Sequence, residues 1–184
     1  MLSKFEQNLP AVVFNILKFI PVIFLFGLLF VFSIHTITDI NQDIGLHLTT
    51  GKIIWQTHSV PGTNLFSYTN PDFEFVNHHW LGEVMFYLLS LIGGLKGLIL
   101  FQAFILTGAF ALAFFSFYKK ESLPVSVAVG IISIFILIDR SLVRPEMFSF
   151  LFLAWYIFVL FRKSDSKLIW SLPLVQLIWV NAHI

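Results

Sequence analysis

Long apolar runs separated by short polar stretches are the feature that most limits what this chain can fold into. An α-helix needs about 20 residues to cross the ~30 Å hydrocarbon core of a membrane, and each run reaches or approaches that length. The runs are Ala11–Ile34, Gly97–Tyr118, Leu123–Ile138, Met147–Phe161 and Leu168–Ile184. The third and fourth are short and need flanking residues. We therefore expect an all-α fold, a polytopic transmembrane bundle of about five spanning helices, with residues 1–184 forming a single membrane domain.

The composition excludes several classes of protein. Only 11% of the residues are charged and 58% are apolar, whereas a soluble domain averages about 25% charged residues. The net charge of +1, without a basic cluster, argues against a nucleic-acid partner and leaves membrane lipids as the expected surroundings. The chain has no cysteine, so disulfides, thiol nucleophiles and cysteine metal sites are excluded.

The basic residues predict an orientation. The run Ala11–Ile34 is typical of an uncleaved signal anchor, because it is long and no small-residue cleavage site follows it. If Trp80–Ile92 does not cross the membrane, seven basic residues lie in the cytoplasm and four outside; if it crosses, the division is five against six. The seven are Lys4, Lys18, Lys119, Lys120, Arg162, Lys163 and Lys167, and the four are Lys52, Lys96, Arg140 and Arg144. The positive-inside rule favours the first arrangement, with a cytoplasmic N-terminus.

The most polar part of the chain is then an extracytoplasmic loop over residues 35–96. Within it, Asp43–Thr57 is predicted to be a surface helix, Pro61-Gly62 a turn and Leu65–Thr69 a short strand. Gly93-Gly94 is expected to break the apolar segment that starts at Trp80. The loop lies on the same side as residues 139–146 and 181–183, so the polar chemistry gathers at one membrane face.

Asp43 and His47 are the first candidate site residues. A carboxylate in an outer loop suits a general base or a metal ligand. The alternative is that Asp43 only caps the predicted surface helix. His47 lies one helical turn further on and faces the same way.

Two imidazoles, His78 and His79, stand beside Trp80. His78 is a candidate for a substrate cavity; the alternative is that both rings are polar anchors at the headgroup level. Adjacent residues of a helix point in different directions, so we do not expect these two rings to share a metal ion.

Arg140 and Arg144 flank the end of a membrane helix, where they either snorkel to the interface or bind a lipid phosphate by a two-pronged contact. Asn181 and His183 end an apolar run, and they either face a cavity or reach the membrane interface.

These residues belong to short motifs that follow one another in a fixed order. The motifs are Asp43-Ile-Gly-Leu-His47-Leu-Thr-Thr-Gly51, Val60-Pro61, Phe66-Ser-Tyr-Thr69, Asn77-His-His-Trp-Leu-Gly-Glu83, Arg144-Pro-Glu-Met-Phe-Ser149 and Trp179-Val-Asn-Ala-His183. Over residues 39–184 this set resembles bacterial polytopic proteins of the GT-C glycosyltransferase superfamily, near the dolichyl-phosphate-mannose-protein mannosyltransferase-like and RgtA/B/C/D-like groups.

The resemblance implies an enzyme of the bacterial plasma membrane that takes a sugar from a polyprenyl-phosphate donor and gives it to an acceptor that the sequence does not identify. It also implies that the chain corresponds to the N-terminal part of a larger protein. It makes Asp43 the catalytic residue and places Arg144, Arg140 and His47 near the donor phosphate. His78, Glu83, Asn181 and His183 become substrate-cavity candidates.

One departure from the family pattern affects the expected cofactor. The first acidic residue of the family's D-x-D motif is Asn41 here, while Asp39 lies two residues earlier. A divalent metal ion held by Asp43 and Asp39 is therefore an open alternative to a reaction without a metal.

A second interpretation is a non-enzymatic membrane protein, such as a lipid-carrier transporter or an assembly subunit. The break at Gly93-Gly94 suits the discontinuous helix of a transporter. The two interpretations predict different geometry. An enzyme requires Asp43, Arg144 and His183 to converge on one outer cavity, whereas a transporter requires polar side chains near the membrane midplane.

Overall fold

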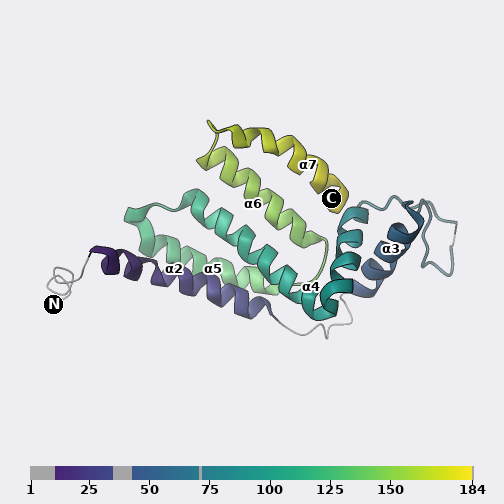
Figure 1. The fold of residues 1–184 in the computed structure, drawn as a ribbon, viewed down its shortest axis with the longest axis horizontal. Helices are drawn as coiled ribbons and strands as arrows, with labels where there is room; N and C mark the ends of the chain where they lie inside the picture. The colour runs from purple at the N-terminus through teal and green to yellow at the C-terminus, as the bar shows by residue number, and fades with distance from the viewer. Residues whose placement is uncertain (1–10, 35–42, 71, 184) are drawn as a thin grey trace.

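The computed structural model describes residues 11–34, 43–70 and 72–183, and helices dominate it (Figure 1). The elements, in order, are α2 (Ala11–Ser33), α3 (Ile44–Thr57), α4 (Trp80–Phe117), the 3-10 turn η1 (Lys120–Ser122), α5 (Leu123–Asp139), α6 (Glu146–Arg162), the 3-10 turn η2 (Lys167–Trp170) and α7 (Ser171–Ala182). The predicted all-α class is confirmed for these ranges.

Helix α4 consists of two helical segments joined at Gly94. This glycine has φ 58° and ψ −155°, a non-helical conformation inside a helix of 38 residues. Side chains other than hydrogen disfavour that backbone region, so glycine is the residue that permits the bend. The predicted break at Gly93-Gly94 is confirmed. Figure 1 shows the first segment standing beside α3 and the second segment running back through the bundle.

Two apolar clusters hold the helices together. The second segment of α4 packs against α2 and α5 through a cluster of buried residues, which are Leu25, Leu29, Leu106, Phe110 and Ile134. Around the bend in α4, a second cluster joins the starts of α4 and α6 to the end of α7; its buried members are Phe86, Leu98, Val143, Met147, Phe148 and Ala182. Helix α4 is therefore the central element, and the ring of Phe86 in the second cluster lies 6.2 Å from the ring of His47, one of the polar side chains described below.

One helix of the described residues, α4, is long and apolar enough to cross a membrane by length and composition. Its most apolar 18-residue window has a mean hydropathy of 2.3. The apolar segments Phe19–Ser33, Leu123–Asp139 and Lys167–Ala182 are shorter. Crossing by the other predicted runs remains a prediction.

The segment that connects α3 to α4 folds back on itself instead of forming the predicted strand. Thr63 and Glu74 form an isolated antiparallel bridge. The expected strand at Leu65–Thr69 is wrong. Side chains of this segment bond to nearby main-chain groups: Asn64 Oδ1 accepts from the N–H of Phe66 at 3.0 Å, and Ser67 Oγ accepts from the N–H of Asn70 at 3.1 Å. Such local bonds favour turns over strands.

Candidate functional site

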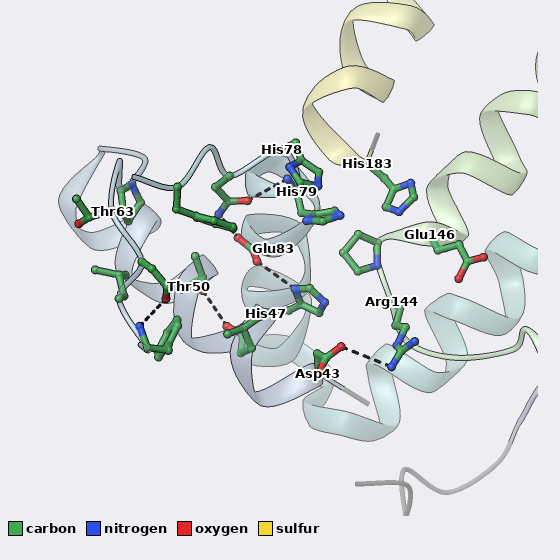
Figure 2. Close-up of a pocket in the computed structure, with 18 residues that line it drawn as sticks. Asp43, His47, Thr50, Thr63, His78, His79, Glu83, Arg144, Glu146 and His183 are labelled. Atoms are coloured by element: carbon green, nitrogen blue, oxygen red, sulfur yellow. Dashed lines mark hydrogen bonds and ion pairs between the residues drawn. The ribbon is translucent and has the colours of Figure 1, made fainter. Parts of the chain in front are cut away.

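A cavity of about 450 Å³ lies where α3, the segment after it, the start of α4, the start of α6 and the end of α7 meet (Figure 2). Six of the predicted site residues line it: Asp43, His47, His78, Glu83, Arg144 and His183. The side chains come from motifs that are far apart in the sequence, and Figure 2 shows them turned toward a common space. The convergence of Asp43, Arg144 and His183, which the enzyme interpretation requires, is therefore present in the structure.

A close approach of α3 to α4 builds one wall of the cavity. A side chain at Gly51 would overlap the main-chain carbonyl group of Glu83, so only glycine permits this approach. The approach buries His47 and Thr50 against α4, where their residues are 7% and 6% exposed. The face of α3 that carries these polar side chains is thus the buried one, whereas Trp55 is 48% exposed.

Glu83 lies at the centre of a buried hydrogen-bond network. Its Oε1 atom is 3.0 Å from Nδ1 of His47, and its Oε2 atom accepts from Nδ2 of Asn77 at 2.6 Å. The Oδ1 atom of Asn77 in turn accepts from the main-chain N–H of His79 at 2.9 Å. Glu83 is only 3% exposed, and a buried carboxylate requires partners of this kind. The network fixes α3 and the segment before α4 relative to each other.

Asp43 forms an ion pair with Arg144. The Oδ2 atom of Asp43 lies 3.5 Å from Nη2 of Arg144, and the side chains are 63% and 31% exposed. Asp43 occupies the N-cap position of α3, but its side chain makes no capping hydrogen bond. The alternative that Asp43 serves only as a helix cap is therefore wrong.

Four imidazoles border the cavity. The ring centroids of His78 and His79 are 4.1 Å apart, His79 lies 5.1 Å from His183, and His47 lies 6.0 Å from His79. Both residues precede α4, which begins at Trp80, so the helical spacing used to argue against a shared metal ion does not apply to them, and that expectation stays a prediction. Burial and then the neighbouring imidazoles of His78, His183 and His47 lower the pKa of His79 to about 4, against an opposing effect of Glu83.

His183 is held in place by a chain of two hydrogen bonds. Its Nδ1 atom lies 2.7 Å from Oγ of Ser149, which accepts from Nε1 of Trp179 at 2.8 Å. Burial lowers the pKa of His183, and nearby Glu146 opposes that effect. Both shifts favour the uncharged form of these two rings.

Two of the predicted site residues, Asn181 and Arg140, do not line the cavity. Asn181 accepts a hydrogen bond from Nε1 of Trp80 at 2.8 Å, which connects the end of α7 to the start of α4. Gly82 allows the end of α7 to approach α4 closely, because a Cβ atom at this position would lie 2.8 Å from the carbonyl oxygen of Ala182. Arg140 is exposed at the C-terminal end of α5. Asp39 lies outside the described residues.

Sequence reasoning missed several residues that shape the site: Thr50, Asn77, His79, Glu146, Ser149 and Trp179. Most of them were visible as members of the motifs, such as Ser149 in the segment after Arg144 and Trp179 in the segment before His183. Their roles were not visible, since each role depends on contact with a residue from another segment.

The expected metal ion is not tested by this geometry. Over residues 11–34, 43–70 and 72–183, no three histidine, aspartate or glutamate side chains are arranged so that they could hold a metal ion. Asp39, the second expected ligand, is not among these residues. A divalent ion therefore stays a prediction of the resemblance.

Comparisons with known protein families, with curated proteins and with solved structures find no match to the chain. The chemistry of the cavity therefore has to be inferred from its side chains. They combine carboxylates at Asp43, Glu83 and Glu146 with the guanidinium of Arg144 and four imidazoles. This set suits the binding of a ligand that carries both hydroxyl groups and an anionic group.

Proposed function

We propose that the chain belongs to a membrane glycosyltransferase that moves a sugar from a polyprenyl phosphate to an acceptor hydroxyl. The observation that supports this most directly is the pairing of Asp43 with Arg144 at the wall of a cavity lined by imidazoles. A sugar phosphate linked to a lipid needs a cation for its phosphate, and its acceptor needs a base for the hydroxyl proton. Asp43 and Arg144 supply these two groups side by side.

In the proposed reaction, the acceptor oxygen attacks the anomeric carbon while the bond from that carbon to the phosphate oxygen breaks. The acceptor proton passes to the carboxylate of Asp43, and the lipid phosphate leaves with the bonding electrons. The sugar passes through an oxocarbenium-like state, as in glycoside chemistry generally, and the anomeric centre inverts. Arg144 stabilises the negative charge that remains on the phosphate.

The ion pair between Asp43 and Arg144 has a place in this scheme. In the absence of substrate the guanidinium partly neutralises the carboxylate. An arriving phosphate competes for Arg144, since a guanidinium binds phosphate by two parallel hydrogen bonds. Asp43 is then left to face the acceptor hydroxyl. The exposure of the carboxylate, at 63%, leaves room for this exchange of partners.

The proposed setting is the bacterial plasma membrane, with the N-terminus in the cytoplasm and the cavity at the outer face. Large apolar side chains on several helices are directed outward, which suits contact with lipid. Examples are Phe24 at 68% exposure, Phe135 at 73% and Leu177 at 63%. Helices α5 and α6 have 17 residues each, about 26 Å of helical rise, which is close to the hydrocarbon thickness.

The alternative function is a lipid-carrier transporter, and the non-helical conformation of Gly94 favours it. Such a protein is expected to bind its cargo near the middle of its helices. Gln102 lies near the middle of α4, but it is only 1% exposed. The polar cavity lies instead where helix ends meet, so the enzyme is the proposal we favour.

The test is transfer of a radiolabelled sugar from a polyprenyl-phosphate donor in vesicles that contain the complete gene product. The Asp43→Ala variant is expected to lose transfer by at least about 100-fold, which is the usual contribution of a general base. Asp72→Ala is the matched control, because Asp72 is an exposed acid outside the cavity. Wild-type transfer by Asp43→Ala would show that Asp43 is not the base. Uptake of the lipid carrier without any sugar transfer would favour the transporter.

A further inference from the structure

Two imidazoles that line the cavity, His47 and His183, are bonded through Nδ1 to different kinds of partner. Nδ1 of His47 lies 3.0 Å from the carboxylate of Glu83, and Nδ1 of His183 lies 2.7 Å from the hydroxyl of Ser149. A neutral imidazole carries one proton on its two ring nitrogens. The partner of Nδ1 therefore decides whether Nε2 is a hydrogen-bond donor or an acceptor.

At His47 the partner is an acceptor. The amide nitrogen of Asn77 is a donor only, and it bonds Oε2 of Glu83 at 2.6 Å. Glu83 thus serves as an acceptor on that side, and its Oε1 atom is left for His47. An ionised carboxylate only accepts, so Nδ1 of His47 is assigned the donor role, and in the neutral ring Nε2 keeps a lone pair.

At His183 the direction is reversed. Nε1 of Trp179 is a donor only, so Oγ of Ser149 accepts from it at 2.8 Å. The hydroxyl proton of Ser149 is then available for His183. The separation of 2.7 Å is typical of an O–H donor and shorter than the usual N–H···O bond. This separation favours the hydroxyl of Ser149 as the donor, so Nδ1 of His183 is assigned the acceptor role and Nε2 the proton.

We propose that the structure holds His47 and His183 in opposite tautomers, so that the cavity offers a ligand one acceptor nitrogen and one N–H donor. The next assignment rests on the proposed function: Nε2 of His47 accepts a hydrogen bond from a hydroxyl of the acceptor or of the donor sugar. An oxygen of the lipid phosphate is assigned to His183. Glu83 and Ser149 are then positioning residues, because they act through the imidazoles and not on the substrate.

The surroundings of the two rings support this arrangement. The ring of His79 lies between them, 6.0 Å from His47 and 5.1 Å from His183, and all three border the cavity in Figure 2. Burial lowers the pKa of both His79 and His183, which favours the neutral form of both rings. A neutral His183 carries one ring proton and can hold a single tautomer. In the proposed tautomer this proton is on Nε2, which can donate a hydrogen bond to a phosphate oxygen.

The tautomers can be measured directly in the full chain without substrate. The protein is labelled with ¹⁵N-histidine, placed in detergent micelles at mildly alkaline pH and examined by two-bond ¹H–¹⁵N correlation spectra, in which protonated and unprotonated ring nitrogens have well-separated shifts. His47→Gln and His183→Gln variants assign the resonances. We expect a protonated Nδ1 in His47 and a protonated Nε2 in His183. The same tautomer in both rings, or averaged shifts in either, would overturn the proposal.

Two variants test the positioning residues. Ser149→Ala should move the ring nitrogens of His183 toward averaged shifts, whereas Ser133→Ala should not; the hydroxyl of Ser133 bonds only its own helix, to the carbonyl of Val129 at 2.9 Å. In Glu83→Gln the amide of Asn77 keeps the new carbonyl oxygen on its side. The new NH₂ group then faces His47, whose tautomer should invert. An unchanged tautomer in either cavity variant would overturn the role given to that residue.

These spectra are independent of sugar transfer. If a variant does not fold, the wild-type spectra still decide the tautomers. Opposite tautomers together with an absence of transfer activity would refute the proposed glycosyltransferase and leave the polarised cavity intact. Active transfer together with equal tautomers would support the glycosyltransferase and refute the proposed pair of opposite tautomers.

Discussion

The carboxylate of Asp43 lies 3.5 Å from the guanidinium of Arg144, although the two residues belong to motifs in distant parts of the chain. One residue precedes α3 and the other precedes α6, so the pair joins the first polar segment to the bundle. Since both side chains are partly exposed, the pair contributes little to folding, about 1 kcal/mol or less. Its placement in the cavity wall therefore suits a role in binding better than a role in stability.

Arg144→Lys is expected to weaken donor binding more than it slows the reaction. A lysine keeps the charge but loses the two parallel hydrogen bonds to a phosphate, so KM for the donor should rise by about 10-fold or more while kcat changes less. Arg162→Lys is the matched control, since Arg162 lies at the opposite end of α6. Steady-state transfer assays at varied donor concentration separate the two constants. An unchanged KM would exclude Arg144 as a phosphate ligand.

The helices were largely predictable because their physical cause is local. Apolar runs set the positions of α2, α5 and α6 to within a few residues, and paired glycines marked the bend in α4. The strand expected at Leu65–Thr69 failed for an equally local reason. Asn64 and Ser67 bond to main-chain groups two and three residues away, and these bonds outweigh the β-propensity of the apolar and aromatic residues between them.

The site was only partly predictable, because contacts between distant segments decide it. The motifs identified Asp43, Arg144 and His183 as candidates, and the structure places all three at one cavity. Asn181 belongs to the same motif as His183 but bonds Trp80 instead of lining the cavity. A single sequence does not show whether Asn181 or His183 faces the cavity, because contact with Trp80 of another helix decides it.

Gly94→Ala is expected to destabilise the protein by about 1–3 kcal/mol. The cause is the backbone conformation at φ 58° and ψ −155°, which disfavours any Cβ atom. Gly93→Ala is the matched control, because Gly93 is helical and a Cβ atom there meets nothing within 4 Å. The control should be neutral or up to about 1 kcal/mol more stable. Thermal unfolding in detergent measures both, and equal melting temperatures would contradict the bend at Gly94.

Gly51→Ala should separate α3 from α4. The added Cβ atom would overlap the main-chain carbonyl group of Glu83, and such overpacking costs about 1–3 kcal/mol. Gly45→Ala on the same helix is the control, since nothing lies within 4 Å of a Cβ atom there. We expect Gly51→Ala to lower the melting temperature and also to expose His47. Gly45→Ala should do neither, and parallel behaviour of the two variants would argue against the close approach.

The stability of the protein should fall as the pH drops from about 6.5 to about 4. Over this range an unfolded chain binds a proton at His79, whose ordinary pKa is 6.5, whereas the folded chain does not until its pKa of about 4. Binding to the unfolded state alone lowers the free energy of unfolding, and the effect is absent above pH 6.5. The lowered pKa of His183 acts in the same direction. The imidazoles of His78, His183 and His47 strengthen the effect at His79, and the carboxylate of Glu83 weakens it.

Substituting His79 should flatten this pH dependence. His79→Gln removes the titrating ring, so its melting temperature should vary less between pH 6.5 and pH 4 than that of the wild type. His58→Gln is the control, because His58 is an exposed histidine at the end of α3, away from the cavity. Melting temperatures of the three proteins across that pH range provide the comparison. If His79→Gln kept the full wild-type slope, the proton uptake would have to come from other groups, and the burial of His79 among the imidazoles would not be its cause.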